Sequence, residues 1–191
     1  PGVVMVTSGP GATNAITGIA TAFMDSIPMV VISGQVQSHL IGTDAFQETD
    51  MIGISRPIVK HSFTVDHQSN IPRIVKEAFY VATSGRQGPV VIDVPKDLTN
   101  PDDLFDFNYP DEANIRSYNP PIKPEENQID RVIEALKNSK RPVIYAGGGT
   151  IASNASNELR EFNSYIKAPV TNTLMGLGVY PGTDKYFLGM L

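Results

Sequence analysis

The chain has 191 residues, of which 41% are hydrophobic and 18% are charged, and its formal net charge is -5. This composition supports a buried core, and it argues against a disordered chain and against nucleic acid as a partner. The absence of cysteine excludes a disulfide framework and a metal site with Cys ligands, and no apolar run reaches the ~18 residues of a membrane span.

The first part of the chain has the pattern of a βαβ unit. Residues 3–6 are apolar and mostly β-branched, which predicts a strand buried on both faces of a parallel sheet. A Gly-rich turn at 8–11 precedes apolar residues at helical spacing, which predict a helix over 12–25 that ends before Pro28. A second buried strand is expected over 29–33.

The next segments continue this alternation. Residues 34–50 are polar and mixed, which predicts a long loop of the kind that often carries function after a strand. The spacing of apolar residues predicts a strand within 58–65, a helix over 71–84 and a buried strand over 89–94.

Composition changes at residues 99–124, which are rich in Pro, Asp and Asn and predict an interdomain linker. A second α/β unit is expected after it, with helices over 125–138 and 152–166 and strands over 142–146 and 169–171. The first of these helices has one apolar face, formed by Ile129, Val132, Ile133 and Leu136.

The turn Ser8–Gly11 is the first candidate ligand site. Glycines allow the backbone to approach a ligand closely, and the free N–H groups at a helix start favour anions. The same pattern is typical of a tight turn that binds nothing, and it is neither Gly-x-Gly-x-x-Gly nor a Walker loop.

Three further segments carry polar or glycine residues after expected strands. The loop Asp44–Glu48 combines an aromatic ring, an amide and a carboxylate, which suit a heterocycle. Lys96 suits an anionic group, and Gly147–Gly149 suits a phosphate. Each also has an ordinary interpretation as a loop or surface residue. His39, His61 and His67 have no spacing typical of a metal site or a catalytic triad.

Together these segments show a specific resemblance. The motifs in question are Ser8–Asn14, Gly34–Val36, Gly42–Glu48, Lys60–His61, Ser84–Arg86, Val94–Asp97, Gly147–Gly149 and Leu174–Gly178. Their order resembles that of the acetolactate synthase catalytic subunit family. The Gly-Pro-Gly-Ala-Thr-Asn run is shared widely among thiamine-diphosphate enzymes, whereas the Ala-Phe-Gln-Glu loop, Pro-Lys-Asp and Leu-Met-Gly-Leu-Gly are narrower.

The resemblance implies an α/β fold with doubly wound, mostly parallel sheets. Residues 1–98 correspond to most of an N-terminal domain that binds the pyrimidine of thiamine diphosphate. Residues 99–124 form the linker, and 125–191 form the first part of a truncated, Rossmann-like central domain that binds FAD.

The resemblance also implies site residues. Phe46, Gln47 and Lys96 match catalytic positions along the substrate channel, and Gln47 is expected near thiamine diphosphate. The positions that match the channel for substrates and inhibitors are Lys60, Gln37, Ala45 and Lys96. Those that match FAD contacts are Ser26, Arg86, Gly148, Thr173 and Leu174.

The implied reaction belongs to branched-chain amino-acid biosynthesis. Pyruvate is decarboxylated on thiamine diphosphate, and the two-carbon unit is joined to pyruvate or 2-oxobutyrate. The family's catalytic glutamate is expected before Pro1 and its Mg2+ ligands after Leu191, so the chain alone is expected to be inactive; Glu48 belongs to a different motif.

Further expectations concern the surroundings of the enzyme. The enzyme is expected to be a homodimer or homotetramer in the cytoplasm, which a regulatory small subunit can join. No membrane and no nucleic acid is expected as a partner. Gln37 stands where some members have Pro or Ala, and Gln87 replaces a frequent Pro. The alternatives are a pyruvate oxidase, a sulfoacetaldehyde- or glyoxylate-converting relative, and a non-catalytic nucleotide-binding or interaction module.

Overall fold

The computed structural model describes residues 1–191, which form two compact units, Pro1–Ile122 and Lys123–Leu191. Each unit is an α/β structure with its own parallel sheet and its own core. Residues 100–125 contain no helix or strand. Ile115 and Tyr118 nevertheless pack against the core of the first unit, so this part of the expected linker is attached to that unit.

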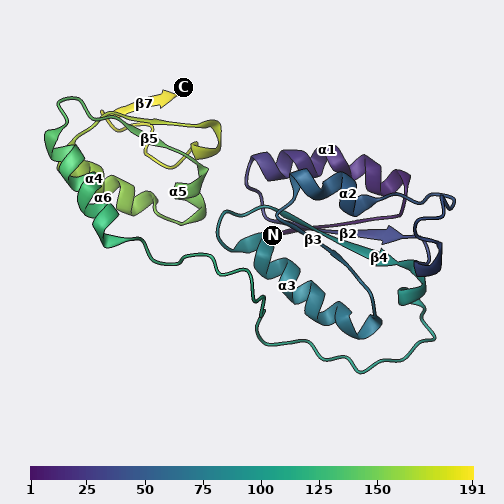
Figure 1. The fold of residues 1–191 in the computed structure, drawn as a ribbon. Helices are drawn as coiled ribbons and strands as arrows, with labels where there is room; N and C mark the ends of the chain where they lie inside the picture. The colour runs from purple at the N-terminus through teal and green to yellow at the C-terminus, as the bar shows by residue number, and fades with distance from the viewer. The chain divides into compact units, whose positions relative to one another are not determined.

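The first unit is built on four parallel strands (Figure 1). They occur in the spatial order β1-β2-β4-β3, and all neighbours are parallel. The central pair is in register, with Val31 opposite Val91. The bounds are β1 (Gly2–Val6), β2 (Met29–Gln35), β3 (His61–Thr64) and β4 (Pro89–Pro95).

Helices cover both faces of this sheet, as Figure 1 shows: α1 (Pro10–Met24) and α2 (Met51–Ser55) lie on one face and α3 (Ile71–Thr83) on the other. Successive strand residues point to opposite faces. Val31 therefore packs with α1 and α2, while Val30 packs with α3. The prediction of a doubly wound parallel fold is confirmed.

Strand β1 differs from its prediction. It was expected to be buried on both faces, but Val3 is 55% exposed and Met5 is 76% exposed. The reason is position: β1 is the edge strand, and no helix of this unit covers the face on which these side chains lie.

Short helices connect the main elements of the first unit. The expected loop between residues 34 and 50 begins only after Gln35, because β2 is longer than predicted. Helix α2 was not predicted; its Met51 is buried, and Asp50 caps it by accepting a hydrogen bond from the N–H of Gly53 at 2.8 Å. The single-turn helices are η1 (Ser38–Leu40), η2 (Arg56–Ile58), η3 (Gln68–Asn70) and η4 (Lys96–Thr99).

The second unit has a three-stranded parallel sheet in the order β5-β6-β7. Its core is formed by Ala146, Val170, Val179 and Tyr180. The strands are β5 (Ile144–Ala146), β6 (Val170–Asn172) and β7 (Phe187–Met190), and the helices are α4 (Glu126–Asn138), α5 (Gly148–Ala152), α6 (Ser156–Ile166) and η5 (Leu174–Gly176).

One predicted helix of this unit is wrong at its start. The helix expected over 152–166 is two helices, because Asn154 adopts φ 57° and interrupts the backbone between α5 and α6. Gly147–Gly149 is also not a loose loop, since α5 begins at Gly148. Strand β7 and η5 were not predicted.

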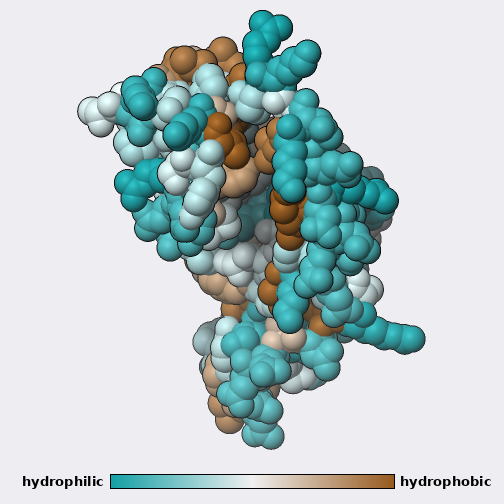
Figure 2. Space-filling model, turned by 90° about the vertical axis from the view of Figure 1, so that its left-hand side faces the viewer, coloured by the Kyte–Doolittle hydropathy of each residue, from teal (hydrophilic) through white to brown (hydrophobic).

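Helix α4 is amphipathic but contributes no buried residue. Ile129 is 44% exposed, Val132 58% and Ile133 43%. Figure 2 shows hydrophobic residues exposed between hydrophilic ones on the face that it presents. The apolar face predicted for this helix therefore exists, but this chain does not cover it.

Candidate functional site

The carboxyl edge of the first sheet collects three loops that follow β1, β2 and β4. Parallel strands end at the same edge, so the turn Ser8–Gly11, the segment 36–50 and the segment 96–99 converge there. This edge holds five of the eleven residues implied by the family resemblance, namely Gln37, Ala45, Phe46, Gln47 and Lys96.

The turn after β1 contacts the long loop directly. Gly9 has φ +57°, and a methyl group placed on it would lie 2.7 Å from the carbonyl oxygen of Gln47. Only glycine gives the backbone this conformation together with this close approach. Gln47 itself has φ 60°. The structure therefore places Gln47 beside the start of α1.

Glu48 organises the loop that carries Gln47. Its carboxylate accepts hydrogen bonds from the N–H of Gly42 at 2.5 Å and of Ala45 at 2.9 Å. These bonds hold the pKa of Glu48 below its ordinary value. Phe46 is left 89% exposed at the tip of the loop.

Two polar side chains that sequence reasoning did not select lie beneath this loop. Gln35 Nε2 donates to the carbonyl of Thr49 at 2.7 Å and to Asp93 Oδ2 at 3.1 Å. Asp93 is 3% exposed, and burial, with a smaller contribution from the charge of Asp50, raises its pKa to about 6. The signal that identifies this pair is a carboxylate and an amide inside strands that are otherwise apolar.

Gln37 and Lys96 come together through their neighbours. Asp97 accepts hydrogen bonds from the N–H of Ser38 at 2.8 Å and from its hydroxyl at 3.1 Å. These bonds lower the pKa of Asp97. The residues that follow β2 and β4 are thereby joined, and the exposed ammonium of Lys96 lies at the same edge as Gln47.

Lys60 lies elsewhere. It precedes β3, and its N–H donates to the carbonyl of Pro89 at 2.8 Å, which places it at the amino edge of the sheet. Because β4 has seven residues, the two edges are about 20 Å apart. Its ammonium donates to the carbonyls of Val81 and Ser84 and to the hydroxyl of Tyr118.

Ser26 and Arg86 form a pair at the amino edge as well. Arg86 Nε donates to Ser26 Oγ at 2.9 Å, and its Nη2 donates to the carbonyl of Met24 at 3.3 Å. The guanidinium also lies 5.9 Å from the ring centre of Phe23. Arg86 thus binds the carbonyl of Met24, which α1 leaves free at its end.

Gly148, Thr173 and Leu174 lie together in the second unit, after the adjacent strands β5 and β6. A methyl group on Gly148 would lie 3.0 Å from Met175 Cβ, so the two turns pack closely. The hydroxyl of Thr173 accepts a hydrogen bond from the N–H of Gly176 at 3.1 Å, and Leu174 is 66% exposed. Asn172, fully buried in the preceding strand, has no partner for either atom of its amide.

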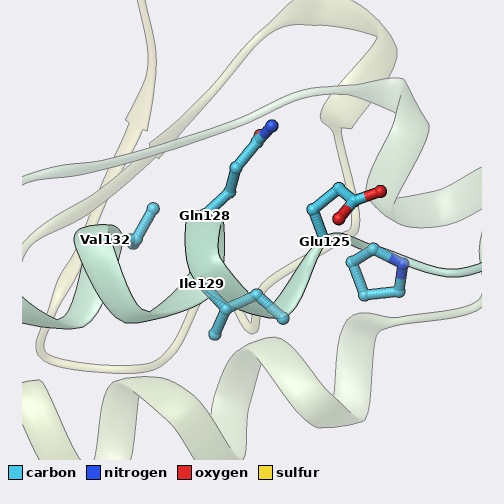
Figure 3. A pocket seen from close by; sticks show the side chains of 5 residues that line it. Glu125, Gln128, Ile129 and Val132 are labelled. Atoms are coloured by element: carbon cyan, nitrogen blue, oxygen red, sulfur yellow. The ribbon is translucent and has the colours of Figure 1, made fainter.

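A separate hollow lies along α4 and involves none of these residues. It is lined by Pro124, Glu125, Gln128, Ile129 and Val132 (Figure 3). No group of three or more His, Asp or Glu side chains is arranged to hold a metal ion. None of the helices has the length and hydrophobicity that crossing a membrane requires.

Two family models match the chain. Residues 1–54 match "Thiamine pyrophosphate enzyme, N-terminal TPP binding domain", and residues 129–191 match "Thiamine pyrophosphate enzyme, central domain". The two matches fall in different structural units.

Curated relatives match over the whole chain. It is 63% identical over 190 residues to the acetolactate synthase large subunit of Buchnera aphidicola subsp. Acyrthosiphon pisum and 56% identical to that of Haemophilus influenzae. It is 55% identical to the acetolactate synthase isozyme 3 large subunit of Escherichia coli K12. The match covers 100% of this chain but 33% of each relative, so the chain spans about one third of their length.

Proposed function

Since the chain belongs to the family of thiamine pyrophosphate enzymes, we propose that it is part of the catalytic large subunit of an acetolactate synthase. The proposed reaction removes CO2 from pyruvate and joins the remaining two-carbon unit to pyruvate or 2-oxobutyrate, in branched-chain amino-acid synthesis. The chain spans about one third of its relatives, so this activity is proposed for the whole protein.

The observation that carries the proposal is the contact between Gly9 and Gln47. The turn that contains Gly9 is common to many thiamine-diphosphate enzymes, whereas the loop that contains Gln47 has the narrower acetolactate synthase pattern. Their contact joins the general cofactor element to the specific loop at the ligand-binding edge of a parallel sheet. A module that merely shared the fold would not require it.

The residues at this edge have distinct proposed tasks. Thiamine diphosphate, when bound, supplies the carbon nucleophile and the electron sink for decarboxylation. The amide of Gln47 offers both a donor and an acceptor to polar groups near the cofactor. The ammonium of Lys96 attracts the carboxylate of a 2-oxo acid, and the ring of Phe46 screens that encounter from water. Gln37 and Ala45 border the same channel.

The second unit is proposed to contribute to FAD binding. The close turns around Gly148 and Thr173, and the unpaired buried amide of Asn172, fit a polar ligand at the end of β5 and β6. The other residues proposed to contact FAD are Ser26, Arg86 and Leu174. Mg2+ is proposed to bind acidic groups elsewhere in the whole protein. The boundaries 1–98, 99–124 and 125–191 are part of the same proposal.

The placement of Lys60 bears on the oligomeric state. Lys60 and the group around Gln47 lie at opposite edges of one sheet, about 20 Å apart. A channel that uses both needs further surfaces, and we propose that a second copy of the chain supplies them in a homodimer or homotetramer. The relatives are named large subunits, so a smaller regulatory partner in the cytoplasm is proposed as well.

The test uses the full-length protein with pyruvate, thiamine diphosphate, Mg2+ and FAD. We expect acetolactate formation that depends on thiamine diphosphate and falls by about 100-fold in Gln47→Ala. Gln128→Ala is the matched control, because it removes an exposed amide from α4. It should keep wild-type activity. Absence of acetolactate under every cofactor combination would refute the reaction, and a different product would favour another member of the family.

A further inference from the structure

Gln35 is the only side chain of β2 that bonds to both the neighbouring strand and the long loop. Its Nε2 donates to Asp93 Oδ2 at 3.1 Å and to the carbonyl of Thr49 at 2.7 Å. Its Oε1 accepts from the N–H of Val36 at 2.8 Å. Both Gln35 and Asp93 are buried. The amide therefore connects β4 with residue 49.

Further hydrogen bonds connect the residues of the loop between this contact and its tip. Glu48, next to Thr49, accepts hydrogen bonds from the N–H groups of Gly42 and Ala45. Asp50, on the other side of Thr49, begins α2 by capping it at Gly53. A displacement of Thr49 is thus transmitted to Ala45, and with it to Phe46 and Gln47, instead of being absorbed by a flexible chain.

The pair is unusual for its surroundings. Residues 90–92 of β4 and 30–31 of β2 are buried and apolar. A carboxylate and an amide buried in such strands destabilise the fold unless hydrogen bonds replace those they made to water. Asp93 Oδ1 is even left without a partner. Outside the two strands, the side-chain hydrogen bonds of the pair reach the long loop alone.

We propose that Gln35, oriented by Asp93, is a positioning residue that fixes the Gly42–Asp50 loop and thereby places Gln47 against Gly9 for the reaction. The inference rests on the proposed function for its catalytic consequence. Its structural part, the fixation of the loop, stands on the hydrogen bonds alone.

The first test compares Gln35→Met with wild type in the full-length protein. Methionine has a similar length but no donor. We expect kcat for acetolactate formation to fall by about tenfold or more with a smaller change in KM for pyruvate, since the loop is misplaced rather than removed. Amide hydrogen exchange of residues 42–50 should become at least about tenfold faster, while exchange in β2 and β4 stays slow.

Two further variants separate positioning from stability. Val30→Ala opens a cavity on the α3 face of the same strand and should lower the melting temperature without changing kcat or loop exchange. Asp93→Asn keeps an acceptor for Gln35 and should retain at least about half of kcat, whereas Asp93→Ala should reproduce Gln35→Met.

The outcomes are distinguishable. Wild-type kcat and wild-type loop exchange in Gln35→Met would overturn the inference while leaving the proposed function intact. Equal losses of kcat in Gln35→Met and Val30→Ala would also overturn it, because stability alone would then explain both. If wild type forms no acetolactate, the proposed function fails, and hydrogen exchange still decides whether Gln35 fixes the loop.

Discussion

The ammonium of Lys60 donates a hydrogen bond to the hydroxyl of Tyr118 at 2.9 Å, across 58 residues of sequence. The same ammonium donates to the carbonyls of Val81 and Ser84 at the end of α3, and it lies 5.3 Å from the centre of the Tyr118 ring. Burial alone would raise the pKa of Tyr118, but the hydrogen bonds from Lys60 and Ser84 outweigh it and lower the pKa. Lys60 therefore ties the segment around Tyr118 to the first unit.

Removing the hydroxyl of Tyr118 should loosen this attachment. Tyr118→Phe keeps the ring against the core but removes one partner of Lys60, so we expect a loss of about 1 kcal/mol in the free energy of unfolding. Urea denaturation of the full-length protein measures it. Tyr165→Phe is the control, because Tyr165 is 76% exposed. Equal stability of the two variants would show that the Lys60 contact does not stabilise the unit.

Two glycines near the start of the chain should respond oppositely to alanine. Gly9 has φ +57° and lies against Gln47, so Gly9→Ala should destabilise the protein by about 2 kcal/mol or more and lower kcat. Gly18 is inside α1 with nothing within 4 Å of an added methyl group, so Gly18→Ala should stabilise by about 0.5–1 kcal/mol. Thermal unfolding and acetolactate assays measure both, and a neutral Gly9→Ala would contradict the contact.

The second unit depends on a buried amide. Asn163 is 1% exposed; its Nδ2 donates to the hydroxyl of Tyr180 at 2.9 Å, and its Oδ1 accepts from the N–H of Ala168 at 2.9 Å. Asn163→Ala should cost about 2–4 kcal/mol, because it leaves both groups unpaired and opens a cavity. Tyr180→Phe should cost less, since only one bond is lost. The reverse order in urea denaturation would show that the ring's hydroxyl, not the amide, is the important group.

The main elements of the first unit were predictable because local pattern and burial agree there. The helix expected over 71–84 is α3 almost unchanged, with Ile74, Ala78 and Ala82 buried as its spacing predicts. The exposure of Met5 was not predictable, since a strand's position at a sheet edge depends on pairing with distant residues. The break at Asn154 was missed because apolar spacing continues across it.

The site was predictable only in part. The motif residues Gln37, Gln47 and Lys96 lie at one edge of the sheet, since Gln37 and Lys96 follow parallel strands and Gln47 contacts the turn after β1. The separation of Lys60 from them follows from strand direction, which no short motif contains. Gln35 and Asp93 were missed because their importance depends on a hydrogen bond between residues 58 positions apart.

The ionisation of Asp93 provides a prediction in which sign matters. Its pKa is raised to about 6 from an ordinary 3.8, so between these values the folded protein binds more protons than the unfolded one. The stabilisation that comes from protonating Asp93 is thus fully present below about pH 4, and it is lost as the pH rises through about 6.

Asn cannot ionise, so the stability of Asp93→Asn relative to wild type should increase over this interval, by at most about 3 kcal/mol. Urea denaturation at pH 4, 5, 6 and 7 measures the difference in the free energy of unfolding between the two proteins. Other carboxylates with lowered pKa values also make stability depend on pH, but their contributions cancel because both proteins contain them; they are Glu48, Asp66 and Asp97. A difference that is constant with pH would mean that Asp93 keeps an ordinary pKa, and that its buried oxygen Oδ1 reaches water when the carboxylate is charged.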